Sequence, residues 1–403
     1  MEETKERRYG SWMLIAVCLL LFGTAIASTQ YKVPVIMSNL MEMFGMDSGS
    51  SSWLMSIFTF AGIVLALPTG ALAKKIGPKN VLVIAAVVMV IGSLIGAFSS
   101  DGMMLIVSRG IEGVAFIFVT ICGPLCVQKY VAPDKIGSAT GIWALWVCLG
   151  SVVGGTLTPS LFSATGFVGV WVIYAVCVAI FAVLMFLCVK FPGGAEEERA
   201  IAAEEAAAQA GQGKASYAEL LKPNFLLFLL AFLAFNMVLL AVLSFGPTWM
   251  QVQGIDPTMS GFISTLPMLL AVISSPLFGN LIDRFGRCKP LLIIAMLSMG
   301  PCAYLMLTGT GAMLWVGAVL MGLVGLGCPV VCLTALNPIV GKPELASISM
   351  GVLMLVQSLG QFLGTFVSPM LLGAGGDQWM TLGIAMLVIG LAGTGIAAVC
   401  KFK

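Results

Sequence analysis

The sequence contains no histidine, and charged residues make up only 9% of its 403 positions. The absence of histidine excludes histidine acid–base catalysis, a Ser-His triad and a metal site built on imidazole. The chain also lacks a G-x-x-x-x-G-K-[ST] phosphate loop, which argues against direct use of ATP. A soluble domain carries roughly a quarter charged residues. We therefore expect neither an enzyme nor a nucleic-acid-binding protein, and we expect no cofactor and no metal site.

Apolar residues are present in large excess, at 59% of the chain, and the mean hydropathy is +1.06. A helix needs roughly 20 apolar residues to cross a bilayer, and charge-free runs of that length follow one another along the chain. The runs Lys135–Lys190 and Lys289–Lys342 are too long for one helix, so each should be a hairpin, with turns near Gly166 and Gly309. The sequence predicts an all-α membrane protein with twelve transmembrane helices.

Basic residues indicate the orientation, because cytoplasmic loops of membrane proteins are enriched in Lys and Arg. With the N-terminus inside, every base except Lys32 and Arg109 falls in a cytoplasmic segment. The outward segments carry only acids, namely Glu42, Asp47, Asp101, Asp256 and Asp377. We expect a multi-pass protein of the inner or plasma membrane, surrounded by lipid, with both termini cytoplasmic. We also expect it to act as a monomer.

The 11 cysteines lie almost entirely within the predicted spans. The pairs Cys122/Cys126 and Cys328/Cys332 have helical i,i+4 spacing but lack the second group of ligands that a zinc site needs. We interpret them as small apolar packing residues, with a redox or metal site as the alternative.

A change of composition divides the chain into two similar parts. Between Pro192 and Gly213 an Ala/Glu-rich segment lies between glycines, which is typical of a linker. We expect an N-terminal six-helix bundle at 1–190, a cytoplasmic linker at 191–222 and a C-terminal six-helix bundle at 223–403. The halves repeat at a nearly constant offset: Gly70 and Gly77 recur as Gly279 and Gly286, and Gly141, Gly150, Gly154 and Pro159 recur as Gly351, Gly360, Gly364 and Pro369. Such repeats are typical of transporters that move one bundle against the other around a central site.

The loop repeat resembles the major facilitator superfamily, whose cytoplasmic loop after the second helix of each half reads G-x-L-x-D-R-x-G-R. The segment 279–287 reads GNLIDRFGR, whereas the first copy, at 70–79, reads GALAKKIGPK and has Lys74 in place of the aspartate. The resemblance implies that these loops gate the inward face. The expected gating residues are Gly70, Lys74, Gly77, Gly279, Asp283, Arg284, Gly286 and Arg287.

The fourth span carries a second motif of this family. Its segment 109–115 reads RGIEGVA, which is similar to R-x-x-x-G-x-A, with Glu112 where glutamine is more usual. The fifth span partly resembles the glycine motif of exchangers, although Gly155 replaces the expected proline. Close helix packing through Gly150/Gly154 and Gly360/Gly364 explains those glycines without any transport role.

Charges within the spans mark candidate sites, because a charge in hydrocarbon costs several kcal/mol or more. Lys32 lies in the polar stretch Ser28–Pro34, where the proline should break or bend the first helix beside a cavity. The alternative is that Lys32 extends to the outer interface. Arg109 and Glu112 are three residues apart and share a helix face, so they form either a structural salt bridge or part of the transport machinery.

Together Lys32, Arg109 and Glu112 leave one net positive charge, which favours an anionic substrate. We expect Lys32, Arg109, Gln30 and Tyr31 to bind it and Glu112 to couple protons. The C-terminal half has only amides to offer, and Asn236, Gln357 and Gln361 complete the expected substrate site, unless these amides instead join helices.

We therefore predict a secondary transporter working by alternating access. It should move a small organic or inorganic anion by proton symport or exchange. The alternative is an exporter of drugs or amphipathic metabolites by proton antiport, suggested by the glycine motif and by the 25 methionines.

Overall fold

The computed structural model describes residues 11–190, 222–341, 346–373 and 375–401. These residues are almost entirely helical and include no strand. The expected linker, apart from Lys222, lies outside the described residues. The all-α fold class predicted from composition is confirmed.

The first bundle contains the helices that precede residue 190. They are α1 (Trp12–Val35), α2 (Met37–Phe44), α3 (Ser48–Ile76), α4 (Pro78–Ala97), α5 (Gly102–Tyr130), η1 (Pro133–Lys135), α6 (Ile136–Trp143) and α7 (Trp146–Cys188). The second bundle contains α9 (Pro223–Val252), α10 (Pro257–Phe285), α11 (Cys288–Thr308), α12 (Ala312–Leu323), η3 (Gly325–Gly327), α13 (Cys328–Val340), α14 (Ala346–Leu372) and α15 (Trp379–Val399).

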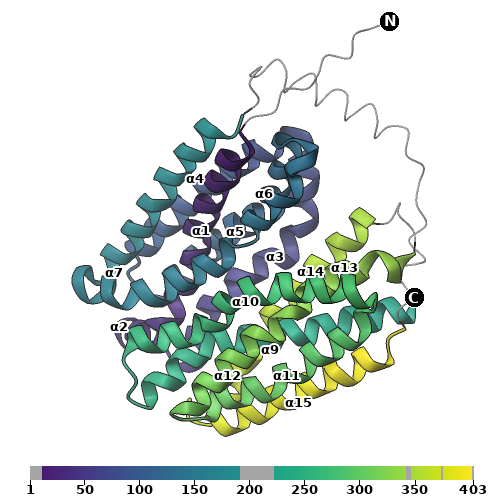
Figure 1. Cartoon of the computed structure of the whole chain (residues 1–403). Coiled ribbons are helices and arrows are strands. Elements are labelled where there is room, and N and C mark those ends of the chain that lie inside the picture. Colours follow the sequence, from purple (N-terminus) through teal and green to yellow (C-terminus); the bar gives the residue numbers. More distant parts are fainter. Residues whose placement is uncertain (1–10, 191–221, 342–345, 374, 402–403) are drawn as a thin grey trace, which may run out of the picture.

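Figure 1 shows these two groups side by side, the first in purple to teal and the second in green to yellow. The bundles meet mainly along two helix pairs, α3 with α14 and α7 with α10, and α1 also contacts α9 and α10. Each bundle also has its own buried apolar core.

In the described residues, 11 helical segments are long and apolar enough to cross a membrane. One of them, Pro133–Cys188, has 56 residues and turns back at Gly166, whose φ of 70° is non-helical. A positive φ of this kind costs glycine little, because it has no Cβ. The segment therefore supplies two crossings, which gives the twelve predicted spans. The other predicted turn lies at Gly309, between α11 and α12.

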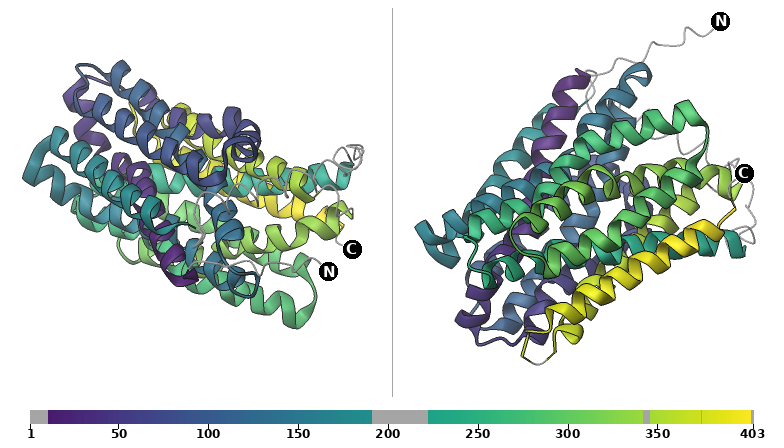
Figure 2. Two further views of the ribbon diagram at one scale, coloured as in Figure 1. Left: turned by 90° about the horizontal axis from the view of Figure 1, so that it is seen from above. Right: turned by 60° about the horizontal axis from the view of Figure 1, so that its bottom comes forward.

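We call the end where α1 begins and α7 ends the linker end, and the opposite end, with the Gly166 turn, the distal end. Figure 2 gives two further views of the same arrangement. At the distal end two aspartates cap helices that carry the candidate site: Asp47 accepts from the Ser50 N–H at 2.7 Å and begins α3, and Asp101 accepts from the Met104 N–H at 2.8 Å and begins α5. The Met104 N–H also holds the pKa of Asp101 below its usual value.

The repeated glycines lie where helices cross closely. A Cβ on Gly154 in α7 would lie 2.6 Å from the Ser28 carbonyl oxygen of α1. In the second bundle a Cβ on Gly364 in α14 would lie 2.3 Å from the Met237 carbonyl oxygen of α9. Such distances are too short for any side chain, so the repeat preserves one packing contact in both bundles.

Candidate functional site

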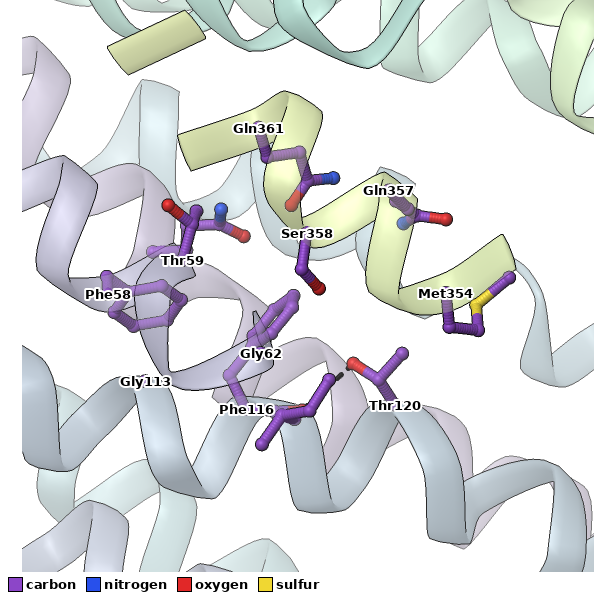
Figure 3. A pocket seen from close by; sticks show the side chains of 12 residues that line it. Phe58, Thr59, Gly62, Gly113, Phe116, Thr120, Met354, Gln357, Ser358 and Gln361 are labelled. Atoms are coloured by element: carbon purple, nitrogen blue, oxygen red, sulfur yellow. Dashed lines mark hydrogen bonds between the residues drawn. The ribbon is translucent and has the colours of Figure 1, made fainter. Parts of the chain in front are cut away.

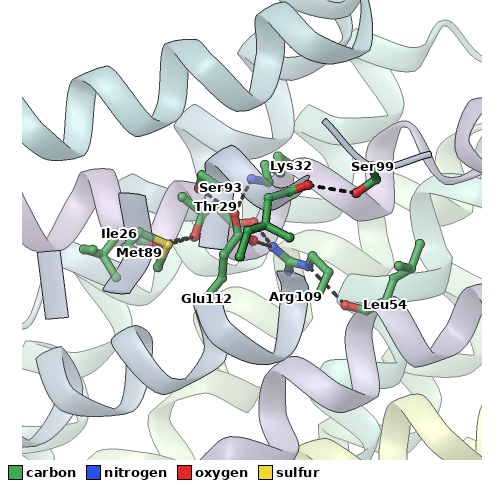
Figure 4. A network of polar contacts seen from close by, with 10 residues as sticks. Ile26, Thr29, Lys32, Leu54, Met89, Ser93, Ser99, Arg109 and Glu112 are labelled. Carbon is green, nitrogen blue, oxygen red and sulfur yellow. Dashed lines mark hydrogen bonds and ion pairs between the residues drawn. The ribbon is translucent and has the colours of Figure 1, made fainter. Parts of the chain in front are cut away.

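Three charged side chains meet inside the first bundle: Lys32 of α1, and Arg109 and Glu112 of α5. All three are 0% exposed. One Glu112 oxygen accepts from Lys32 Nζ at 2.8 Å and from the Ser93 hydroxyl of α4 at 2.6 Å, while the other oxygen pairs with Arg109 Nη1 (Figure 4). We call these four residues the charge cluster.

Arg109 also connects the cluster to two neighbouring helices. Its Nε donates to the Leu54 carbonyl of α3 at 3.1 Å, and its Nη1 donates to the Thr29 carbonyl of α1 at 2.9 Å. Its Nη2 is buried and has no hydrogen-bond partner among the described residues. Arg109 therefore has one guanidinium nitrogen left for another acceptor.

The charge of the cluster is not balanced, because two bases face one carboxylate. A buried ion needs a partner and hydrogen bonds to offset the loss of hydration. Aromatic rings supply part of that compensation: Lys32 Nζ lies 4.2 Å from the ring centroid of Trp171, and the guanidinium carbon of Arg109 lies 4.4 Å from that of Phe58. Contacts of this type contribute about 2 kcal/mol when desolvated.

A small cavity lies between the bundles, between α1, α3 and α5 on one side and α14 on the other (Figure 3). It holds about 30 Å³ of space open to a water molecule, which is room for about two waters at roughly 10–15 Å³ each. Its polar wall consists of three carboxamides and three hydroxyls, and no charged residue lines it: Gln30, Gln357, Gln361, Thr59, Thr120 and Ser358. A larger solute requires the bundles or the wall side chains to move.

The predicted site residues thus fall into separate places. Gln30, Gln357 and Gln361 line the cavity. Lys32 and Arg109 do not line it, because they lie behind its wall in the charge cluster. The wall at that point is made of Phe58, whose ring covers Arg109, and of Gly113, which follows Glu112 in the chain.

Two other predicted residues lie apart from the cavity. Tyr31 is 4% exposed and packs in the same apolar cluster as the core of the second bundle. Asn236 is 2% exposed and donates to the Phe232 carbonyl of its own helix at 2.8 Å. Its Cβ faces Gly360, where α9 and α14 cross.

The expected gating loops lie at the linker end. Gly77 (φ 85°) joins α3 to α4, and Gly286 (φ 62°) ends α10, so both loop repeats use a backbone conformation that favours glycine. Lys74, Arg284 and Arg287 are exposed, and a Cβ on Gly70 or Gly279 would meet nothing within 4 Å. Asp283 lies in the last turn of α10, and its side chain is outside the described part of the structure.

Sequence reasoning missed the contacts that join the two bundles at the distal end. Ser56 of α3 donates to the Thr365 hydroxyl of α14 at 2.9 Å, and the rings of Trp53 and Phe366 lie 5.4 Å apart. At the other helix pair, a Cβ on Gly261 of α10 would lie 1.9 Å from the Gly155 carbonyl oxygen of α7. Gly155 alone lies in a motif discussed above, and no pattern predicts these contacts, because each joins positions that are far apart in the chain.

Known proteins resemble the chain in sequence and in fold. The galactose-proton symporter of Escherichia coli (strain K12) is 33% identical over 154 residues, which are 38% of this chain and 32% of that protein. A probable nitrate transporter, NarT, of Staphylococcus haemolyticus is 27% identical over 268 residues, 64% of this chain and 65% of that protein. The matched region therefore spans only about a third of the sugar symporter.

Solved structures show the same fold at low identity. A bacterial homolog of the human lysosomal transporter Spinster, in an inward-facing and occupied conformation, superposes with a TM-score of 0.76 at 16% identity and covers 96% of this chain and 97% of that chain. The peptide transporter POT in complex with sulfate gives 0.72 at 16% identity, covering 95% and 94%.

The sequence profile of the Major Facilitator Superfamily matches residues 13–365 and, separately, 249–403. Both bundles fall within these matches, and the relatives and structural neighbours named above are transporters rather than enzymes. The chain is a membrane transporter that belongs to the Major Facilitator Superfamily.

Proposed function

We propose that this transporter is a proton symporter of a small anion and that it works by alternating access. The observation that carries the proposal is the charge cluster. Two cations face one carboxylate at 0% exposure, and Arg109 Nη2 has no partner among the described residues. An incoming anion would supply both the missing negative charge and the missing acceptor.

The cavity supplies the second half of the proposed site. Two of its carboxamides, Gln357 and Gln361, belong to α14 (Figure 3), and the third, Gln30, belongs to α1. Carboxamides donate and accept hydrogen bonds, so they suit a small oxyanion or carboxylate that enters with its hydration shell partly removed. The solute would rest on these amides before it reaches Arg109.

Glu112 is the proposed proton carrier. It is the only acid in the charge cluster and it holds both cations at once. Protonation of Glu112 would release donors of Arg109 and Lys32 toward the anion, and the anion and the proton would then cross together without net charge. The galactose-proton symporter and the probable nitrate transporter among the relatives support this combination of proton and anion.

We further propose that the protein lies in the cell membrane with the linker end and both termini on the cytoplasmic side, and that the monomer is the working unit. One observation supports an inward-facing state: the contacts Ser56–Thr365 and Gly155–Gly261 join the bundles toward the distal end. The excess of Lys and Arg near the linker end supports the orientation.

A neutral polyhydroxylated solute is the second candidate, because no charged residue is among those that line the cavity. Amides, hydroxyls and the rings of Phe58 and Phe116 are chemically suited to a sugar. In that case the charge cluster would handle the proton alone.

Uptake into proteoliposomes separates the two candidates. Nitrate, a short monocarboxylate, galactose and arabinose would each be tested with an inward proton gradient, using the wild type, Arg109→Gln and Arg109→Lys. An anion symporter should lose uptake in Arg109→Gln and recover part of it in Arg109→Lys, which restores the charge but not the planar fork. Sugar uptake that both variants leave unchanged, with no anion uptake in the wild type, would replace the proposal by the second candidate.

A separate variant tests the proposed role of Glu112 in proton coupling. In Glu112→Gln, exchange of labelled for unlabelled substrate should persist while uptake driven by the proton gradient stops. Gradient-driven uptake that survives in this variant would show that Glu112 does not carry the proton.

A further inference from the structure

The ring of Phe58 lies between the cavity and the charge cluster. On one side it lines the cavity beside Gln30 and Phe116. On the other side its face covers the guanidinium of Arg109, with 4.4 Å between the ring centroid and the guanidinium carbon. The side chain is only 2% exposed, and together with Gly113 it separates a polar cavity from three buried charges.

The backbone of Phe58 packs directly against the backbone of α5. A Cβ on Gly113 would lie 2.2 Å from the Phe58 carbonyl oxygen, so α3 and α5 touch backbone to backbone at this point. The centroid of the Phe58 ring lies 5.3 Å from that of Phe116, and both residues line the cavity, which holds about 30 Å³ of space. Rotation about χ1 therefore moves the ring without moving either helix.

We propose that Phe58 is an aromatic gate inside the protein, which keeps the charge cluster dry until a solute occupies the cavity. This inference rests on the proposed function, since it explains how an anion on the uncharged amide wall would reach Arg109. With the ring in place, the anion meets only uncharged groups, and its polar contacts are carboxamides and hydroxyls. With the ring turned aside, Arg109 Nη2, which has no partner among the described residues, becomes the next available donor.

The gate also answers a requirement of symport. Water in contact with Glu112 would allow protons to pass without substrate, because a hydrated carboxylate exchanges protons freely. An apolar ring that excludes water prevents that leak, and a solute that displaces the ring couples the two events. Phe58 is therefore a positioning residue that acts through Arg109 and Glu112.

Chemical access to Arg109 tests the gate directly. The purified transporter would be treated with 2,3-butanedione, which modifies arginine and has the same number of non-hydrogen atoms as the ring that Phe58→Ala removes. Modified sites would be identified by peptide mass spectrometry. The exposed Arg287 is the internal reference. In the wild type Arg287 should react and Arg109 should stay protected.

Three variants give the comparison. Phe58→Ala should raise the rate of Arg109 modification about tenfold or more, and Phe58→Leu, which keeps apolar bulk without a planar ring, should give an intermediate rate. Phe116→Ala is the matched control, because this ring also lines the cavity but does not cover Arg109. It should leave Arg109 as protected as in the wild type.

Protection of Arg109 in Phe58→Ala, or equal modification in Phe116→Ala, would overturn the gate. If Phe58→Ala does not fold, as judged by gel filtration, Phe58→Leu decides the question alone. The measurement needs neither substrate nor proton flux. A wild type that transports no anion therefore refutes the proposed function and leaves the gate standing, whereas unchanged access to Arg109 refutes the gate alone.

Discussion

Replacement of Glu112 by glutamine should destabilise the protein far more than replacement of Lys32 by methionine. Glu112→Gln removes the only negative charge of the cluster and leaves Lys32 and Arg109 buried with no counter-ion. Lys32→Met removes the surplus cation instead. Glu112 then keeps Arg109 and the Ser93 hydroxyl, and the cluster becomes neutral.

The expected magnitudes follow from the 0% exposure of all three charged groups. Breaking a buried pair by removing one partner costs about 3–5 kcal/mol, whereas a well-packed apolar replacement is often neutral or stabilising. For a domain the size of one bundle, each kcal/mol lowers the melting temperature by about 2–4 °C. Glu112→Gln should therefore melt about 6–20 °C lower than the wild type, and Lys32→Met should melt close to it.

Thermal unfolding in detergent, followed by tryptophan fluorescence, measures both shifts. The double variant Lys32→Met/Glu112→Gln is the internal control, because it leaves one unpaired cation instead of two and should recover part of the loss. Equal melting temperatures for the two single variants would show that the cluster is hydrated or already neutral, and the reasoning from buried charge would fail.

Three further changes test other parts of the structure. Gly261→Ala should push α10 away from the Gly155 carbonyl oxygen and slow transport at least tenfold. Gly395→Ala is the control, because a Cβ at Gly395 meets nothing within 4 Å, and this variant should transport normally. Equal initial rates of uptake for the two variants would show that transport does not require the close contact of α7 and α10. Gln357→Ala should raise the KM for uptake roughly 10- to 100-fold, since one hydrogen bond to a charged group is worth about 1.5–3 kcal/mol. An unchanged KM would exclude this amide from the site. Because the pKa of Asp101 is lowered in the folded protein, its cap stabilises α5 at pH values above the ordinary carboxyl pKa of about 4, and this stabilisation is lost as the pH falls through the lowered value. Amide exchange in the first turn of α5 should therefore become faster at acid pH in the wild type and not in Asp101→Ala. Exchange in the wild type that does not change in this way contradicts the cap.

The helical framework could be predicted from the sequence because the bilayer constrains it strongly. A hydrocarbon layer requires long apolar helices, so the lengths of charge-free runs were sufficient to find the spans and the turns at Gly166 and Gly309. The glycine repeat was equally informative, since only a residue without a side chain permits the close approach seen at Gly154 and Gly364.

The arrangement of the candidate site was only partly predictable. Helical spacing places Arg109 and Glu112 on one face, and charge identifies Lys32 as unusual, but neither pattern shows which side chains face a cavity. That depends on how α1, α3 and α5 pack, and the residue that decides it, Phe58, is one of 23 phenylalanines with no sequence signal of its own. Ser93 and the Ser56–Thr365 contact could not be predicted for the same reason.

The placement of charge in one bundle suggests how the two halves divide the work of transport. In the first bundle Arg109 of α5 donates hydrogen bonds to the Thr29 carbonyl of α1 and the Leu54 carbonyl of α3. The charge cluster therefore holds these three helices together, and we expect them to move as one rigid body. The second bundle presents to the cavity amide, hydroxyl and thioether groups from α14, which can exchange hydrogen bonds with a solute at little cost. Variants in α14 should therefore change the KM and leave the proton stoichiometry intact. Variants in the charge cluster should change the stoichiometry as well, and measuring both quantities for one variant of each bundle distinguishes this division from a site shared equally by the two halves.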